Sequence, residues 1–128
     1  MREILFRGKR ADNYNDVEGF FAVYKCRAYI IEMTNGLAVN WHDVIPETVG
    51  QYTGLKDKNG KRIFEADLVM FRSYTEPCEI AWDQEEARWF MKFSDCYIYF
   101  DDRCIPKDFE VIGNIHDNPE LIAEVEGC

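Results

Sequence analysis

Two histidine–aspartate neighbours, His42-Asp43 and His116-Asp117, are the residues of this chain closest in type to a catalytic relay. A histidine acts as a general base when a carboxylate holds its ring in position. Adjacent residues on a strand point to opposite faces, so neither pair forms a relay by itself. We expect His116 to lie in a solvated loop before a final helix. The sequence also contains none of the GxSxG, HExxH, Walker or GxGxxG patterns, which favours a protein that is not an enzyme.

Acidic residues cluster at Asp83, Glu85 and Glu86, and again at Asp101 and Asp102. Carboxylate oxygens are the ligands that Mg²⁺ and Ca²⁺ prefer. Turn chemistry and a solvated acidic surface explain both clusters more simply, so we expect no metal and no cofactor. A metal-dependent enzyme with a scattered acidic site is the weakest of the functional alternatives.

The five cysteines stand at positions 26, 78, 96, 104 and 128. Their number is odd and they contain no CxxC pair, so neither a disulfide framework nor a zinc site is expected. Residues 1–10 are charged and lack the apolar stretch of a signal peptide. We therefore expect reduced thiols in a cytoplasmic protein.

A basic loop, formed by Lys56, Lys58, Lys61 and Arg62, follows Tyr52 in an otherwise acidic chain. Basic residues beside an aromatic ring can hold a phosphate backbone and stack a base. This loop is the candidate binding site if the protein binds nucleic acid. The net charge of −9 disfavours that function, because an acidic protein is repelled by phosphate at long range.

The composition is that of a folded chain, with 47% hydrophobic and 15% aromatic residues among 128. These fractions exclude a disordered chain, and no apolar run approaches the roughly 18 residues that cross a membrane. The length suits one domain over residues 1–128. Within it, residues 11–48 are a candidate β-hairpin insertion or oligomerisation appendage.

Short apolar runs separated by turn residues predict an all-β fold. We expect an SH3-like barrel or a small β-sandwich of short antiparallel strands with a short C-terminal helix. Asn35-Gly36 and the loop 58–61 are the clearest turns. Strands are expected at 3–7, 19–25, 28–33, 37–41, 48–52, 68–72, 79–83, 88–93, 96–100 and 109–115, and the helix at 119–125.

Residues 51–69, QYTGLKDKNGKRIFEADLV, resemble the signature of the YopX family of phage and prophage proteins. The opening residues 2–7 and the ending 109–121, FEVIGNIHDNPEL, resemble that family too. The main departure is Ala66, where the family usually has glycine. The resemblance implies a compact β-barrel related to SH3-like folds, encoded by a phage or prophage in a bacterial host cell. It implies no enzymatic activity.

Four residues of this signature have local roles that physical chemistry explains. Gly54 and Gly60 permit backbone angles that other residues resist, so we expect them at two bends. Asp57 and Asn59 can accept hydrogen bonds from their own backbone within the turn.

The end of the signature and the C-terminal match contain further structural positions. We expect Asp67 to accept backbone N–H bonds and close its loop, in preference to contacting a ligand. Ala66 indicates either that no positive φ is needed there or that modest strain is tolerated. Gly113 lies in the C-terminal match, where Asn118 suits a helix cap and Pro119 the first helical turn.

Three functions remain open from the sequence. The first is a non-enzymatic accessory protein of a phage or prophage that forms a homo-oligomer and binds a host or phage protein. Tyr97, Tyr99 and Phe100 would then form an exposed strand edge, or the basic loop would meet the acidic residues 76–110 of a neighbouring copy. The second is nucleic-acid binding through the basic loop, and the third is the metal-dependent enzyme.

Overall fold

The computed structural model describes residues 4–71, 77–93, 96–99 and 109–121. The chain divides into a first unit, Met1–Gly54, and a second unit, Leu55–Cys128, each of which is described by itself. Residues 11–48 contain three strands of the first unit, and their interpretation as an insertion or an oligomerisation appendage stays a prediction. The number of independently folding domains remains a prediction.

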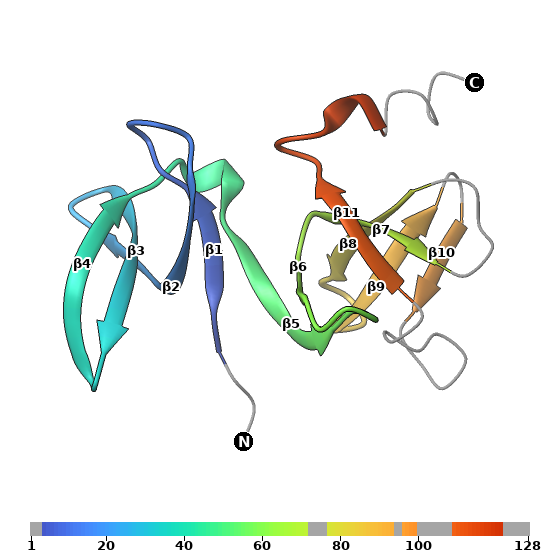
Figure 1. Cartoon of the computed structure of the whole chain (residues 1–128), viewed down its shortest axis with the longest axis horizontal. Helices are drawn as coiled ribbons and strands as arrows, with labels where there is room; N and C mark the ends of the chain where they lie inside the picture. The colour runs from blue at the N-terminus through green and yellow to red at the C-terminus, as the bar shows by residue number, and fades with distance from the viewer. Residues whose placement is uncertain (1–3, 72–76, 94–95, 100–108, 122–128) are drawn as a thin grey trace. The chain divides into compact units, whose positions relative to one another are not determined.

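The first unit is an antiparallel sheet whose strands follow one another in space as β4-β3-β2-β1-β5, with β6 next to β5 (Figure 1). Its strands are β1 (Phe6–Lys9), β2 (Asp16–Tyr24), β3 (Arg27–Thr34), β4 (Leu37–Asp43) and β5 (Gly50–Lys56), with a 3-10 turn at Pro46–Thr48. Asn35 and Gly36 join β3 to β4 with φ values of 54° and 80°. Positive φ at both positions matches the twist of a tight hairpin, and this predicted turn is confirmed.

One face of that sheet carries the core of the first unit. Ala28, Ile30 and Val44 are buried, and Phe6 and Val17 pack against them. Gly19 keeps β2 close to β3, because a Cβ there would lie 2.3 Å from the carbonyl oxygen of Ile31. The opposite face of β2, β3 and β4 therefore points away from this core.

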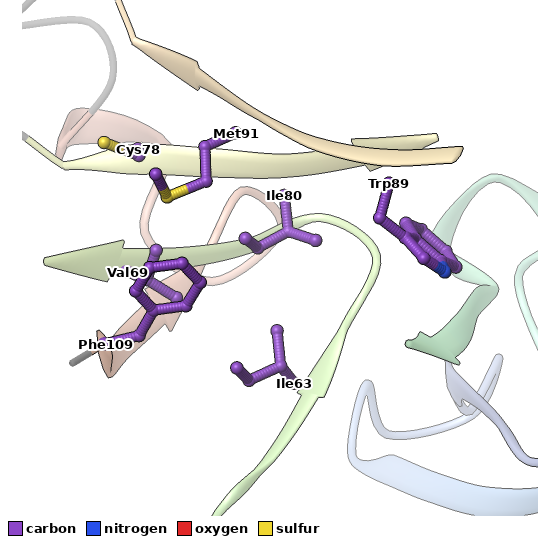
Figure 2. Close-up of a cluster of buried hydrophobic side chains, with 7 residues drawn as sticks. All are labelled: Ile63, Val69, Cys78, Ile80, Trp89, Met91 and Phe109. Atoms are coloured by element: carbon purple, nitrogen blue, oxygen red, sulfur yellow. The ribbon is translucent and has the colours of Figure 1, made fainter. Parts of the chain in front are cut away.

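The second unit contains a five-stranded antiparallel sheet in the order β10-β9-β8-β7-β11. The strands of this sheet are β7 (Asp67–Phe71), β8 (Cys78–Asp83), β9 (Arg88–Phe93), β10 (Cys96–Tyr99) and β11 (Phe109–Asn114); β6 (Arg62–Phe64) is in the same unit but pairs with β5. Alternate residues of these strands point into one core, which Figure 2 shows. Its buried members are Ile63, Val69, Cys78, Ile80, Trp89, Met91 and Phe109.

The all-β fold and both antiparallel sheets confirm the fold class expected from the pattern of apolar residues. Two elements were not predicted, the 3-10 turn at Pro46–Thr48 and the three-residue strand β6. The chain becomes helical at Pro119 and stays so to residue 121; the rest of the expected helix, 122–125, lies outside the described residues. In the described part of the chain, no helix has the length and apolarity needed to cross a membrane.

Candidate functional site

The signature loop is organised by Asp57, whose side chain is buried. Its Oδ1 accepts the backbone N–H groups of Asn59 (2.8 Å) and Lys61 (2.9 Å). Its Oδ2 accepts the N–H of Val111 on β11 at 2.9 Å. Burial acts to raise the pKa of Asp57, but the three backbone N–H donors outweigh it and lower that pKa below 3.8. Asp57 therefore holds the turn to β11, 54 residues further along the chain.

The basic residues of this loop differ in exposure and in pairing. Lys58 pairs with Glu110 of β11 at 3.2 Å. Lys56 and Lys61 are exposed, and Arg62 is half-buried on β6. Tyr52, the aromatic ring of the predicted nucleic-acid site, is only 4% exposed and offers no free face for stacking a base.

The segment Ala66-Asp67 closes the loop between β6 and β7. Asp67 is fully buried, and its Oδ2 accepts the N–H of Phe64 at 2.8 Å, so the predicted loop-closing role is confirmed. Ala66 has a φ of 75°. The interpretation that no positive φ is needed at this position is therefore wrong, and the alternative, a tolerated strain, is the one observed. Hydrogen bonds to Ile80 (2.8 Å) and Ile115 (3.0 Å) hold this residue in place.

Gly54 and Gly60 have φ values of 89° and 80°, the kind of backbone angle expected of glycines at bends. Gly113 has a different role. It adjoins a bulge in β11, and a Cβ on it would lie 2.3 Å from Oδ1 of Asn118. That oxygen accepts the backbone N–H of Asn114 at 3.3 Å, so the side chain of Asn118 holds its loop against the end of β11. The helix begins at Pro119.

The two residues of the histidine–aspartate pair on β4 have different partners. On β4, His42 contacts Glu32 at 2.6 Å, whereas Asp43 pairs with Arg27 at 2.9 Å, as expected for side chains on opposite faces. The backbone N–H of His116 donates to Asn114 within the loop before the helix.

The acidic cluster at 83–86 is a turn. Oδ1 of Asp83 accepts the N–H groups of Glu85 (3.0 Å) and Glu86 (3.1 Å), and its other oxygen accepts the hydroxyl of Tyr99. This hydroxyl lowers the pKa of Asp83, and the carboxylate raises the pKa of Tyr99. Within the described ranges, no group of three or more potential metal ligands occurs. Asp101 and Asp102 lie outside those ranges.

The predicted aromatic edge is only partly described. β10 does end the five-strand order, but Tyr99 is engaged within its own unit. Arg88 lies 4.1 Å from the centroid of its ring, and Phe90 packs beside it. The side chain of Tyr97 and all of Phe100 lie outside the described residues.

Among the described residues, most exposed large hydrophobic side chains lie instead on the first unit, and the sequence pattern did not predict this surface. Cross-strand pairing sets Phe20, Ile31 and Trp41 in one row over β2, β3 and β4. Trp41 packs edge-on against Tyr29 at 5.5 Å. We call this surface the aromatic face; its members are Phe20, Tyr24, Tyr29, Ile31, Met33 and Trp41.

Two apolar features lie near the aromatic face. On the edge strand β4, Val39 is exposed by 49%, and Leu37, which pairs with Thr34 on the opposite face of the sheet, is exposed by 70%. Beside β2, an open hollow of about 590 Å³ is lined by Ile4, Leu5, Glu18, Gly19, Phe20, Glu32 and Met33. Monomeric proteins rarely leave such a contiguous apolar surface in water unless it binds something.

The charge is divided unevenly between the two units. The first has six Lys and Arg against seven Asp and Glu, a net charge of −1. The second has nine against 17, a net charge of −8. The aromatic face therefore belongs to the nearly neutral part of an acidic chain.

Comparison with known proteins agrees with this architecture. Two antiparallel sheets and no other extended element define an all-β protein within the described residues. The family model described as YopX protein matches residues 8–123, so the chain belongs to the YopX family. Among solved structures, the chain is similar to the crystal structure of protein EF1440 from Enterococcus faecalis, with 25% identity, a TM-score of 0.65, and coverage of 95% of this chain and 99% of that one. No curated protein matches the chain.

Proposed function

We propose that this chain is a non-enzymatic accessory protein of a phage or prophage that acts by self-association through the first unit. The observation that carries the proposal is the aromatic face together with the exposed apolar residues Leu37 and Val39 on the edge strand β4. Phe20, Tyr24 and Trp41 are each about half exposed, although large aromatic rings are normally buried. The family resemblance supports a phage origin, a bacterial cytoplasm and an SH3-like barrel as further parts of the proposal.

The area available is compatible with a stable contact between two copies. An aromatic side chain buries about 150–250 Å² when it is fully covered, so three half-exposed rings offer roughly 300 Å². A standard interface hides about 800 Å² on each partner. The exposed Met33 on this face, and the exposed Leu37 and Val39 of the edge strand β4, are needed to approach that area.

The charge distribution favours a second copy meeting this surface. Two chains of net charge −9 repel each other, and the repulsion is smallest where the charge is lowest. The first unit, at −1, can meet itself with little electrostatic cost. A two-fold contact between identical surfaces also closes on itself and gives a defined dimer.

The test is the native mass of the full chain by light scattering, compared with two lysine variants. Leu37→Lys places a charge on the first unit, and the matched control Ile112→Lys does so at an exposed position of the second. We expect a dimer for the parent chain and for Ile112→Lys, and a monomer for Leu37→Lys. A parent chain that stays monomeric at about 100 µM refutes the proposal, as does dissociation by Ile112→Lys alone.

A further inference from the structure

The strand β4 lies at one edge of the first unit's sheet, next to β3 only (Figure 1). A strand in this position presents unpaired backbone N–H and C=O groups and can pair with another chain. Natural proteins usually protect such edges with lysine, proline or a bulge. Residues 37–41 of β4, LAVNW, contain neither a charge nor a proline. Their protection is limited to a bulge opposite Glu32 and Met33.

The backbone directions show which part of this edge is open. The N–H of Val44 donates to Ala28 at 3.1 Å, so Val44 directs its polar groups toward β3. Because these directions alternate along an antiparallel strand, Asp43 and Trp41 direct theirs outward. The carbonyl oxygen of Asp43 indeed accepts the N–H of Ala11 at 2.9 Å.

The loop after β1 therefore covers only one end of the edge. Arg10 forms a β-bridge with Val44, next to the bond between Ala11 and Asp43. Among the described residues, no strand pairs with the outward side of residues 37–41. This open stretch of about five residues, which includes the bulge at Val39, has the length of an ordinary short strand.

We infer that β4 of one copy pairs antiparallel with β4 of a second copy, joining the two sheets into one across a two-fold axis. This inference rests on the proposed function and specifies its interface. The bulge shifts the alternation of faces along β4: Trp41 pairs with Ile31 and Leu37 with Thr34, so the two side chains lie on opposite faces of the sheet, and each flanks the edge that would be paired.

Edge pairing explains two observations together. It satisfies outward backbone groups that water alone would otherwise solvate, and it covers Leu37 and Val39, which are among the most exposed apolar side chains of the described chain. Stacking of two aromatic faces would cover Phe20 and leave the edge of β4 unpaired. The two arrangements are therefore distinguished by which strand tolerates a charge.

Trp41→Lys and Phe20→Lys form a matched pair for this test. Both residues lie in one row on the same face of the sheet. Trp41 is 55% exposed and belongs to the edge strand β4, and Phe20 is 49% exposed and belongs to the inner strand β2. The assay is the dimer dissociation constant of the full chain by analytical ultracentrifugation. We expect Trp41→Lys to weaken the dimer at least tenfold and Phe20→Lys to change it less than threefold.

Equal weakening by both variants overturns edge pairing and leaves self-association through the first unit standing. A parent chain without a dimer refutes both statements. Amide hydrogen exchange of the parent chain tests the same pairing without any substitution. We expect the Trp41 amide to exchange at least tenfold more slowly in the dimer than at dilutions where the monomer prevails; an unchanged rate contradicts the inference.

Discussion

Replacing Ala66 by glycine should stabilise the second unit. Ala66 holds a φ of 75°, a conformation that costs a residue with a Cβ about 1–2 kcal/mol. Glycine adopts it without that steric cost, but it loses about 0.5–1 kcal/mol of additional chain entropy on folding. The two effects leave a net gain of about 0.5–1 kcal/mol, because the 8% exposed methyl group lies outside the main core cluster and contributes little packing.

Two other alanines provide matched controls. Ala87 also has a positive φ, of 53°, but is exposed in the turn between β8 and β9. Ala87→Gly should therefore gain about 1 kcal/mol, since it loses no buried methyl group. Ala81 lies within β8, and Ala81→Gly should lose about 0.5–1 kcal/mol.

The assay is urea unfolding of the full chain, with the free energy of unfolding compared at equal m-values. The reasoning predicts a stabilising effect for Ala66→Gly and Ala87→Gly and a destabilising one for Ala81→Gly. A loss of 1 kcal/mol or more for Ala66→Gly, with Ala87→Gly still stabilising, would show that the Ala66 methyl group is needed for packing. That result would refute the account of this position as tolerated strain.

Three further predictions concern the signature loop, the C-terminal loop and the assembly. Asp57→Asn should destabilise the chain by about 2–3 kcal/mol at neutral pH, because an amide has one acceptor oxygen where the carboxylate uses two. Since the folded pKa of Asp57 is lowered below 3.8, the stabilisation by its carboxylate is present above about pH 4 and is lost as the pH falls through the folded pKa. Urea unfolding from pH 7 to 2 should therefore show the unfolding free energies of the parent chain and Asp57→Asn converging at low pH. A difference that stays constant with pH would contradict the prediction. Gly113→Ala should lower the free energy of unfolding by about 1–3 kcal/mol, because its methyl group would clash with Asn118, and by much less when Asn118→Ala is already present. The two single variants and the double variant are compared by thermal unfolding. Additive effects would exclude the contact with Asn118 as the cause. Added NaCl should strengthen the dimer measured by ultracentrifugation, because it screens the repulsion between acidic chains, whereas pairing of the basic loop with residues 76–110, or binding of DNA, would weaken with salt.

Local signals predicted most of the strands and turns. The strand Arg88–Phe93 was expected with its observed bounds, because the polar residues 84–86 and Ala87 separate two alternating apolar runs. The turn at Asn35-Gly36 needs positive φ, which that dipeptide adopts easily. β6 has only three residues, too few to show a period. β1 begins at Phe6 instead of residue 3, because its register against β2 and β5 decides its start and no local signal does.

The candidate site was harder to predict, because it depends on contacts between distant residues. Asp57 was recognised as a turn residue, but its bond to Val111 could not be read from the turn itself. Lys58 was assigned to a basic loop, and its pairing with Glu110 becomes visible only after folding.

The aromatic face was missed for a related reason. In β2, Phe20 and Phe21 are adjacent and point to opposite faces, so both faces of the strand read as apolar. A strand with two apolar faces resembles one buried on both sides. Only the position of the buried core around Ile30 shows which face is covered.

The central claim is that the first unit mediates self-association, and the most direct test is the mass of the full chain in solution. Light scattering should be recorded between about 1 and 200 µM for the parent chain and for Leu37→Lys. The account predicts a concentration-dependent mass approaching twice the 15.1 kDa of one chain, and a mass of one chain for the variant at every concentration. A parent chain with the mass of a monomer throughout would contradict it.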